Sequence, residues 1–203
     1  MRISAQINMS RAIRKLEELP EKVQTKAIVQ TINEVAARSK VEMSRQIRDR
    51  YNIKAADVNS LLDVSKANKN QASITAIVKA KKPSKRGLNL IRFGARFIQG
   101  RGQVKYVRAI VQGQWKMIPY RDGQGVTATI NKGKRVFVPG AWIATQLAGT
   151  PVLFRDKNNR VRGFTTLDAA GMFIQPTPYN NTVNFAREQL IKSVQRSLDR
   201  FKK

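Results

Sequence analysis

The sequence contains no cysteine and no histidine among its 203 residues. The absence of cysteine excludes disulfide bonds and metal sites built on thiolates. The absence of histidine removes the commonest general base and the commonest metal ligand, together with the usual activator of a nucleophile. The composition therefore argues against catalysis, and we expect a non-enzymatic protein without a metal site or a cofactor.

Long apolar runs are also absent. No stretch approaches the roughly 20 apolar residues that are needed to cross a bilayer, and the first residues, Met1–Gln6, lack the apolar core of a signal peptide. We therefore expect no membrane-spanning segment and no membrane among the final partners, and a protein that is made in the cytoplasm without a standard export signal. Apolar residues nevertheless make up 41% of the chain, which is enough for a folded core. The length predicts one domain over residues 1–203.

Acidic residues are scarce. The chain has 13 of them against 39 lysines and arginines, which gives a formal net charge of +26. Such a charge repels itself in a compact fold, so the protein needs concentrated salt or an acidic neighbour. Nucleic acid, an anionic membrane and acidic proteins are the candidates.

Helical periodicity marks both ends of the chain. A long helix is predicted over residues 20–51. The range begins with Pro20, which suits a first helical turn, and apolar residues recur every three or four positions. Residues 181–202 repeat the pattern, with Asn181 or Thr182 as the expected cap. A shorter helix is expected over 55–62.

Alternating residues predict strands between these helices. The expected strands are 74–79, 104–112, 114–119, 126–131, 134–138, 152–155 and 160–164, the last two joined by a hairpin turn. The order of helices and strands predicts the α+β class: an antiparallel sheet packed against the long N-terminal helix and the C-terminal helix. The glycine pairs at 100–102 and 123–125 are interpreted as flexible loops.

No acidic residue occurs between Asp63 and Asp122, and residues 79–103 are expected to form a basic loop or arm. The candidate contact residues are Lys79, Lys81, Lys82, Lys85, Arg86, Arg92, Arg96, Arg101, Lys105 and Arg108. Aromatic residues such as Phe97 and Tyr106 are interleaved with them. Three interpretations stay open: binding to the phosphate backbone of nucleic acid, a solvated basic face, and docking onto acidic proteins. A nuclease would need clustered carboxylates, for which Asp122, Asp156 and Asp168 are the only candidates outside the helices.

Two short segments resemble a known family. Ile32-Asn33-Glu34-Val35-Ala36 lies in the first long helix, and Val138-Pro139-Gly140-Ala141-Trp142-Ile143 lies midway along the chain. Together with Leu147-Ala-Gly-Thr and the C-terminal helix, the arrangement resembles the minor tail protein Z family of tailed bacteriophages and prophages, also described as tail completion proteins. The resemblance follows nearly the whole chain in order and length.

The resemblance implies a structural virion protein at the head-proximal end of a phage tail, which acts in tail completion, neck assembly and head–tail joining. It implies a homo-oligomer, a hexameric ring by analogy with neck components. The implied partners are the tail terminator, the tail tube and the head–tail connector, with genome DNA in the lumen. It carries no catalytic residues over to this chain. Pro139 and Gly140 suit a tight turn before Trp142, and two interpretations stay open: a strand-ending turn with a buried tryptophan, or a contact site.

Overall fold

The computed structural model describes residues 20–69, 74–80, 87–111, 114–147, 151–156 and 160–201. Helices and antiparallel sheets both occur, and a long helix lies near each end, so the prediction of an α+β fold is confirmed. The chain forms two compact units. Unit 1 comprises Met1–Arg48, Ala55–Pro83 and Asp168–Lys203, and unit 2 comprises Asp49–Lys54 and Ser84–Leu167. The expectation of a single domain stays a prediction.

Unit 1 is mainly helical. Its helices are α2 (Glu21–Arg50), α3 (Ala55–Leu61), α4 (Ala169–Phe173) and α5 (Pro176–Phe201). Its strands β1 (Leu62–Ser65) and β2 (Ile77–Ala80) pair antiparallel. The helices predicted over 20–51 and 55–62 are confirmed within one residue at each end. The sequence had not indicated β1. Within the described ranges, no helix is long and apolar enough to cross a membrane.

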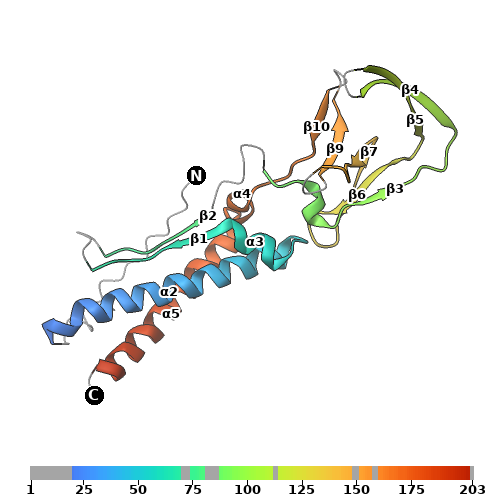
Figure 1. Cartoon of the computed structure of the whole chain (residues 1–203). Helices are drawn as coiled ribbons and strands as arrows, with labels where there is room; N and C mark the ends of the chain where they lie inside the picture. Colours follow the sequence, from blue (N-terminus) through green and yellow to red (C-terminus); the bar gives the residue numbers. More distant parts are fainter. Residues whose placement is uncertain are drawn as a thin grey trace. The chain divides into compact units, whose positions relative to one another are not determined.

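Helices α2 and α5 run side by side and bury their apolar stripes against each other (Figure 1). The core of this pair is formed by Ala27, Val35, Ala186, Leu190, Val194 and Leu198. Val23, Ile28 and Phe201 are partly buried and pack against this cluster. Each stripe thus has a helical partner, whereas the sequence analysis had placed a sheet against both helices.

The start of α5 differs from the prediction. The helix begins at Pro176, five residues before the expected 181, because proline in the first turn has no N–H that would need a helical acceptor. Asn181 and Thr182 therefore lie inside the helix, and their prediction as caps is wrong. Thr182 donates its hydroxyl to the Pro178 carbonyl at 2.9 Å, and Asn181 donates to the side chain of Gln46 on α2 at 3.0 Å.

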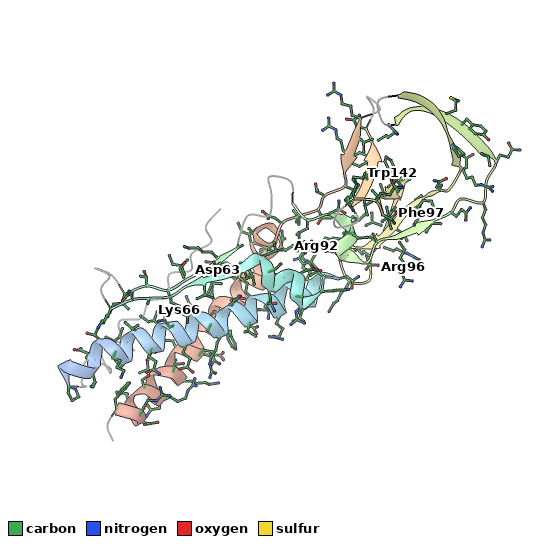
Figure 2. All side chains as sticks on the ribbon, in the orientation of Figure 1. Asp63, Lys66, Arg92, Arg96, Phe97 and Trp142 are labelled. Atoms are coloured by element: carbon green, nitrogen blue, oxygen red, sulfur yellow. The ribbon has the colours of Figure 1, made fainter. Side chains whose placement is uncertain are left out.

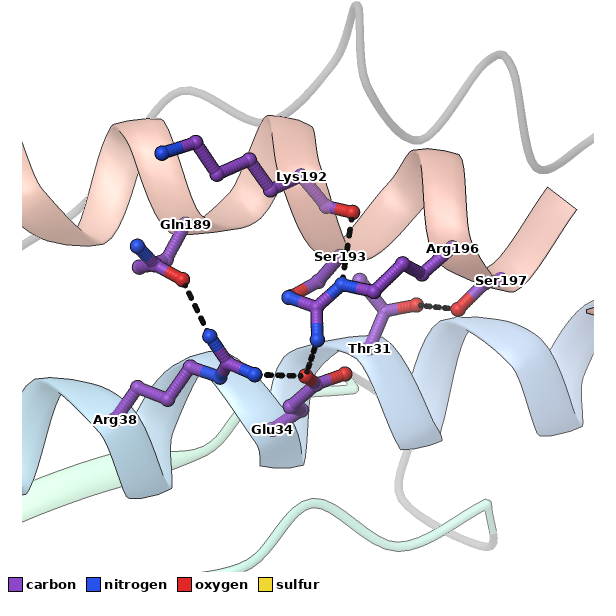
Figure 3. Close-up of polar contacts among 8 residues, drawn as sticks. All are labelled: Thr31, Glu34, Arg38, Gln189, Lys192, Ser193, Arg196 and Ser197. Atoms are coloured by element: carbon purple, nitrogen blue, oxygen red, sulfur yellow. Dashed lines mark hydrogen bonds and ion pairs between the residues drawn. The ribbon is translucent and has the colours of Figure 1, made fainter. Parts of the chain in front are cut away.

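Polar side chains cross the same helix pair (Figure 3). Thr31 and Ser197 share a buried hydroxyl–hydroxyl hydrogen bond of 2.7 Å. Nearby, the carboxylate of Glu34 accepts from Arg38 of its own helix and from Arg196 of α5. A single acidic side chain thereby bridges two cations that would otherwise repel each other.

A second carboxylate, Glu42, is buried on α2. Arg45 donates to both of its oxygens, at 2.9 and 2.7 Å, and Gln46 donates to one of them at 2.7 Å. The hydrogen bonds from Arg45 lower the pKa of Glu42 below the ordinary value of 4.5, against the opposing effect of burial. Through Gln46 and Asn181, this network reaches α5.

Unit 2 consists of short strands around a small core. It contains the 3-10 helix η1 (Leu90–Phe93) and the strands β3 (Arg96–Ile98), β4 (Val104–Val111), β5 (Gln114–Arg121), β6 (Gly125–Thr129), β7 (Arg135–Pro139), β8 (Trp142–Ile143), β9 (Val152–Arg155) and β10 (Val161–Gly163). The sheets run β3-β6-β7 and β10-β9-β8, and β4 pairs with β5. Leu90, Phe93, Val126 and Val152 are fully buried and form the core. The strands predicted over 104–164 are confirmed to within two residues at their ends.

The buried Thr31–Ser197 pair gives a first prediction. Thr31→Val keeps the shape of the side chain but leaves the Ser197 hydroxyl without its partner, which should lower the free energy of unfolding by about 1–3 kcal/mol. Adding Ser197→Ala should cost less in this background than in the wild-type chain. Urea denaturation followed by circular dichroism measures all four proteins. If the loss of stability in the double variant equals the sum of the losses in the two single variants, the two hydroxyls are not coupled.

Glu42 gives a pH prediction. Because its pKa is lowered in the folded state, its stabilisation is present above 4.5 and is lost as the pH falls below that value. Glu42→Gln should therefore lower stability at neutral pH and flatten the fall in stability between about pH 6 and about pH 3. Thermal unfolding across this range is the measurement. The matched control is Glu188→Gln, because Glu188 is exposed on α5. If stability depends on pH in the same way in both variants, the stabilising role of the Glu42 carboxylate is contradicted.

Candidate interaction surface

Strands β4 and β5 form a long antiparallel ribbon that is bent into an arc (Figure 1). Eight residues of each strand pair in register, from Val104 opposite Arg121 to Val111 opposite Gln114. Among the residues that the structure describes, no third strand joins this ribbon. We call residues 104–121 the arm. A two-stranded ribbon has little burial of its own, so an arm of this length is typical of a segment that gains contacts from a partner.

One face of the arm carries exposed apolar side chains. Residues that lie opposite each other in an antiparallel pair share a face, and every second residue along a strand joins them. The register therefore places Val104 and Tyr106 of β4 on the same face as Met117 and Pro119 of β5. Val104, Tyr106 and Met117 are 41%, 63% and 59% exposed. Isolated apolar residues on a surface are ordinary, but four on one face of an uncovered ribbon form a patch.

The root of the arm, where residues 100–103 meet residues 122–125, is tightly packed. A Cβ atom on Gly100 would lie 2.3 Å from the Asp122 carbonyl oxygen, and one on Gly102 would lie 2.8 Å from the Asp122 Cβ. A Cβ on Gly125 would lie 2.4 Å from the Val138 carbonyl oxygen. Gly100 and Gly102 lie in a loop, as the sequence analysis expected, whereas Gly125 lies in β6. At all three positions the missing side chain lets backbone segments pack against one another. Gly123, with a φ of 77°, instead supplies the turn conformation that glycine favours.

The segment around Pro139 braces this root. The Gly140 N–H donates to the Gln124 carbonyl at 2.9 Å, and the Gln124 side chain accepts from the Arg121 N–H at 3.1 Å. Gly140 has a φ of 67° and turns the chain from β7 into β8. Trp142 is half-buried, and the Arg155 guanidinium lies 5.7 Å from the centre of its ring. The Gly140 N–H therefore joins this segment to the turn that follows β5.

The candidate basic residues do not form one cluster: the described ones lie in unit 1, on unit 2 and on the arm. Lys79 is half-buried in β2 of unit 1. Arg92 in η1, Arg96 in β3 and Arg101 are exposed on unit 2, and Figure 2 labels the first two. Lys105, on the arm, forms an ion pair of 2.7 Å with Asp122. Arg108 pairs with Met117 in the ribbon, whereas Lys81, Lys82, Lys85 and Arg86 lie outside the described residues.

The segment 79–103 is more structured than a loop. Its described part contains the end of β2, η1 and β3. Asn89 caps η1 by accepting from the Ile91 N–H, and it also exchanges hydrogen bonds with the Val152 backbone at 2.9 and 3.2 Å. The arm that the sequence analysis expected within 79–103 is formed instead by β4 and β5, the two strands that follow this segment. The sequence analysis assigned no contact role to Val104 or Met117, although the register of the ribbon brings both to one face.

The three carboxylates that the sequence analysis named as nuclease candidates are each engaged separately. Asp122 pairs with Lys105, and Asp156 accepts from the Arg160 N–H and from the Arg162 side chain. Asp168, in unit 1, caps α4 by accepting from the Gly171 N–H at 2.7 Å. Within the parts of the chain that the structure describes, no group of three His, Cys, Asp or Glu side chains could hold a metal ion.

Comparison with known proteins yields no relative. No protein-family model, no curated protein and no solved structure matches the chain.

The packing at the root gives a prediction for Gly100. Gly100→Ala should force Asp122 away from its position and lower the free energy of unfolding by about 1–3 kcal/mol, the usual cost of overpacking. The matched control is Gly163→Ala on β10, where the nearest atom to a new Cβ is 3.7 Å away and an ordinary contact results. Urea denaturation measures both variants. Equal stability of the two would contradict the close packing of the root.

Proposed function

We propose that this protein is a non-enzymatic structural component of a phage particle. It acts at the head-proximal end of the tail, in tail completion, neck assembly and head–tail joining, as a ring of identical chains around the DNA channel. Its neighbours in this proposal are the tail terminator, the tail tube and the head–tail connector. The placement in a phage tail rests on the resemblance of the Ile32–Ala36 and Val138–Ile143 segments to the minor tail protein Z family.

The observation that carries a role in assembly is the arm. An isolated ribbon with an exposed apolar face and cationic residues gains stability from a neighbour and has no evident use in a solitary protein. The Val138–Ile143 segment, which carries much of the resemblance, is also the segment that braces the arm through Gln124. A net charge of +26 further favours a setting in which acidic proteins or DNA supply the opposite charge.

The alternative is a free nucleic-acid-binding protein that contacts the phosphate backbone. Exposed Phe97 and Tyr106 among cations favour it, since aromatic side chains can stack on bases. Binding of this kind weakens steeply with salt, because counterions released from the nucleic acid drive it. The two candidates therefore differ in whether the isolated chain binds an oligonucleotide tightly at physiological salt.

The test is complementation of a phage or prophage from which the gene has been deleted. Arg96→Gln together with Arg101→Gln removes two exposed cations from unit 2 and should reduce head–tail joining, leaving separate filled heads and tails in electron micrographs. The matched control is Arg187→Gln together with Lys192→Gln, which removes two exposed cations from α5. Infectious titre and particle counts are the measurements.

Two outcomes would overturn the proposal. A deletion that yields a normal number of complete, infectious particles excludes a role in head–tail joining. Absence of the chain from purified particles, together with tight oligonucleotide binding by the isolated protein, favours the nucleic-acid-binding alternative.

A further inference from the structure

We propose that the apolar face of the arm is a docking site for an acidic protein segment in extended conformation, in which apolar and acidic side chains alternate. The face consists of Val104 and Tyr106 on β4 and Met117 and Pro119 on β5. The inference rests on the proposed assembly role, which supplies such a partner. It goes further by naming the contact surface and the chemistry that fits it.

The exposed side chains call for an apolar partner. Tyr106 and Met117 leave more than half of their surface in water, and burying such side chains is worth about 25 cal/mol for each Å² of apolar area. A phosphate backbone offers no apolar group for methionine, valine or proline to pack against. A protein surface does offer such groups, and it can also cover a flat ribbon face along its length.

The charge of the arm selects an acidic partner. Residues 104–121 contain Lys105, Arg108, Lys116 and Arg121 and no acidic residue. Arg121 shares the apolar face with Val104, because the two residues are directly opposite in the register. The register also places Arg108 on this face, whereas Lys105 and Lys116 belong to the opposite one. Carboxylates of a docked segment would meet the two arginines, and complementary charge would both speed the encounter and fix its register.

The same charge argues against a second copy of this chain as the occupant. Two arms that met face to face would bring like charges together, and this costs free energy. The root of the arm strengthens the inference for a separate partner. The glycines there pack closely, so the start of the arm is positioned before a partner arrives, and the free part of the ribbon gains its stability on binding.

The experiment uses the full chain and synthetic peptides. A labelled ten-residue peptide in which glutamate alternates with valine is titrated with the protein at physiological salt, and binding is followed by fluorescence anisotropy. Comparison probes are a ten-residue polyglutamate, a peptide in which lysine alternates with valine, and an oligothymidylate. We expect the glutamate–valine peptide to bind at least about tenfold more tightly than the other probes, a difference of about 1.4 kcal/mol.

Paired variants identify the face. Tyr106→Ser together with Met117→Ser should weaken binding of the glutamate–valine peptide by about tenfold or more, because two large contacts are lost. The control is Val41→Ser together with Ile191→Ser, which changes two side chains on α2 and α5 that are each 68% exposed. Circular dichroism checks that both proteins stay folded. All four substitutions lie on exposed positions, so the fold should persist.

Each contrary result overturns the inference in its own way. Equal binding of polyglutamate shows that charge alone is recognised, and equal binding of the lysine–valine peptide shows that charge plays no part. Tighter binding of the oligothymidylate that is lost with Tyr106 and Met117 makes the arm a nucleic-acid contact. Self-association that is lost in the same variant makes a second copy the occupant. None of these results depends on phage particles, so the docking inference and the proposed function fail separately.

Discussion

The scarcity of carboxylates is the constraint on which much of this structure depends. With 13 acidic residues against 39 basic ones, each ion pair that forms has to hold cations close together in a chain that repels itself. Glu34 bridges arginines from α2 and α5, and Glu42 binds Arg45 while a glutamine extends the contact to α5. Asp122 pairs with Lys105 at the start of β4, and Asp156 joins the two strands of a hairpin. These four acidic residues thus connect neighbouring elements or helical turns through their cations.

The secondary structure could be predicted from the sequence because it depends on local patterns. The spacing of apolar residues predicted both ends of α2 to within one residue. Alternating residues and turn residues located six of the described strands of unit 2, whereas the short β3 and β8 were missed. The pairing of α2 with α5 could not be predicted in the same way. Both stripes fit a sheet as well as a helix, and the choice depends on contacts such as Thr31 with Ser197, which are 166 residues apart. The early start of α5 was missed because Pro176 and Pro178 were not considered as first-turn residues.

The candidate surface could be predicted only in part. The run without acidic residues identified the basic region, and the strands of the arm were both expected. Its face could not be assigned before the register of β4 and β5 was known, since a shift of one residue would exchange the two faces. The close packing at the glycines of its root was not predicted, for a related reason. Whether a glycine gives freedom or permits close packing depends on what lies next to it, and Gly100 lies against the backbone of a segment more than 20 residues later.

The division of unit 1 along the sequence has a consequence for how the protein is made. Residues 84–167 of unit 2 lie between the segments that form unit 1, so α2 leaves the ribosome long before α5 has been translated. At synthesis rates of about 5–20 residues per second, the 166 residues between Thr31 and Ser197 correspond to about 10–30 seconds. During that interval the residues of α2 that pack on α5, such as Val35, lack that partner, while most of unit 2 has already emerged. Unit 2 can therefore mature first, and the helix pair closes last.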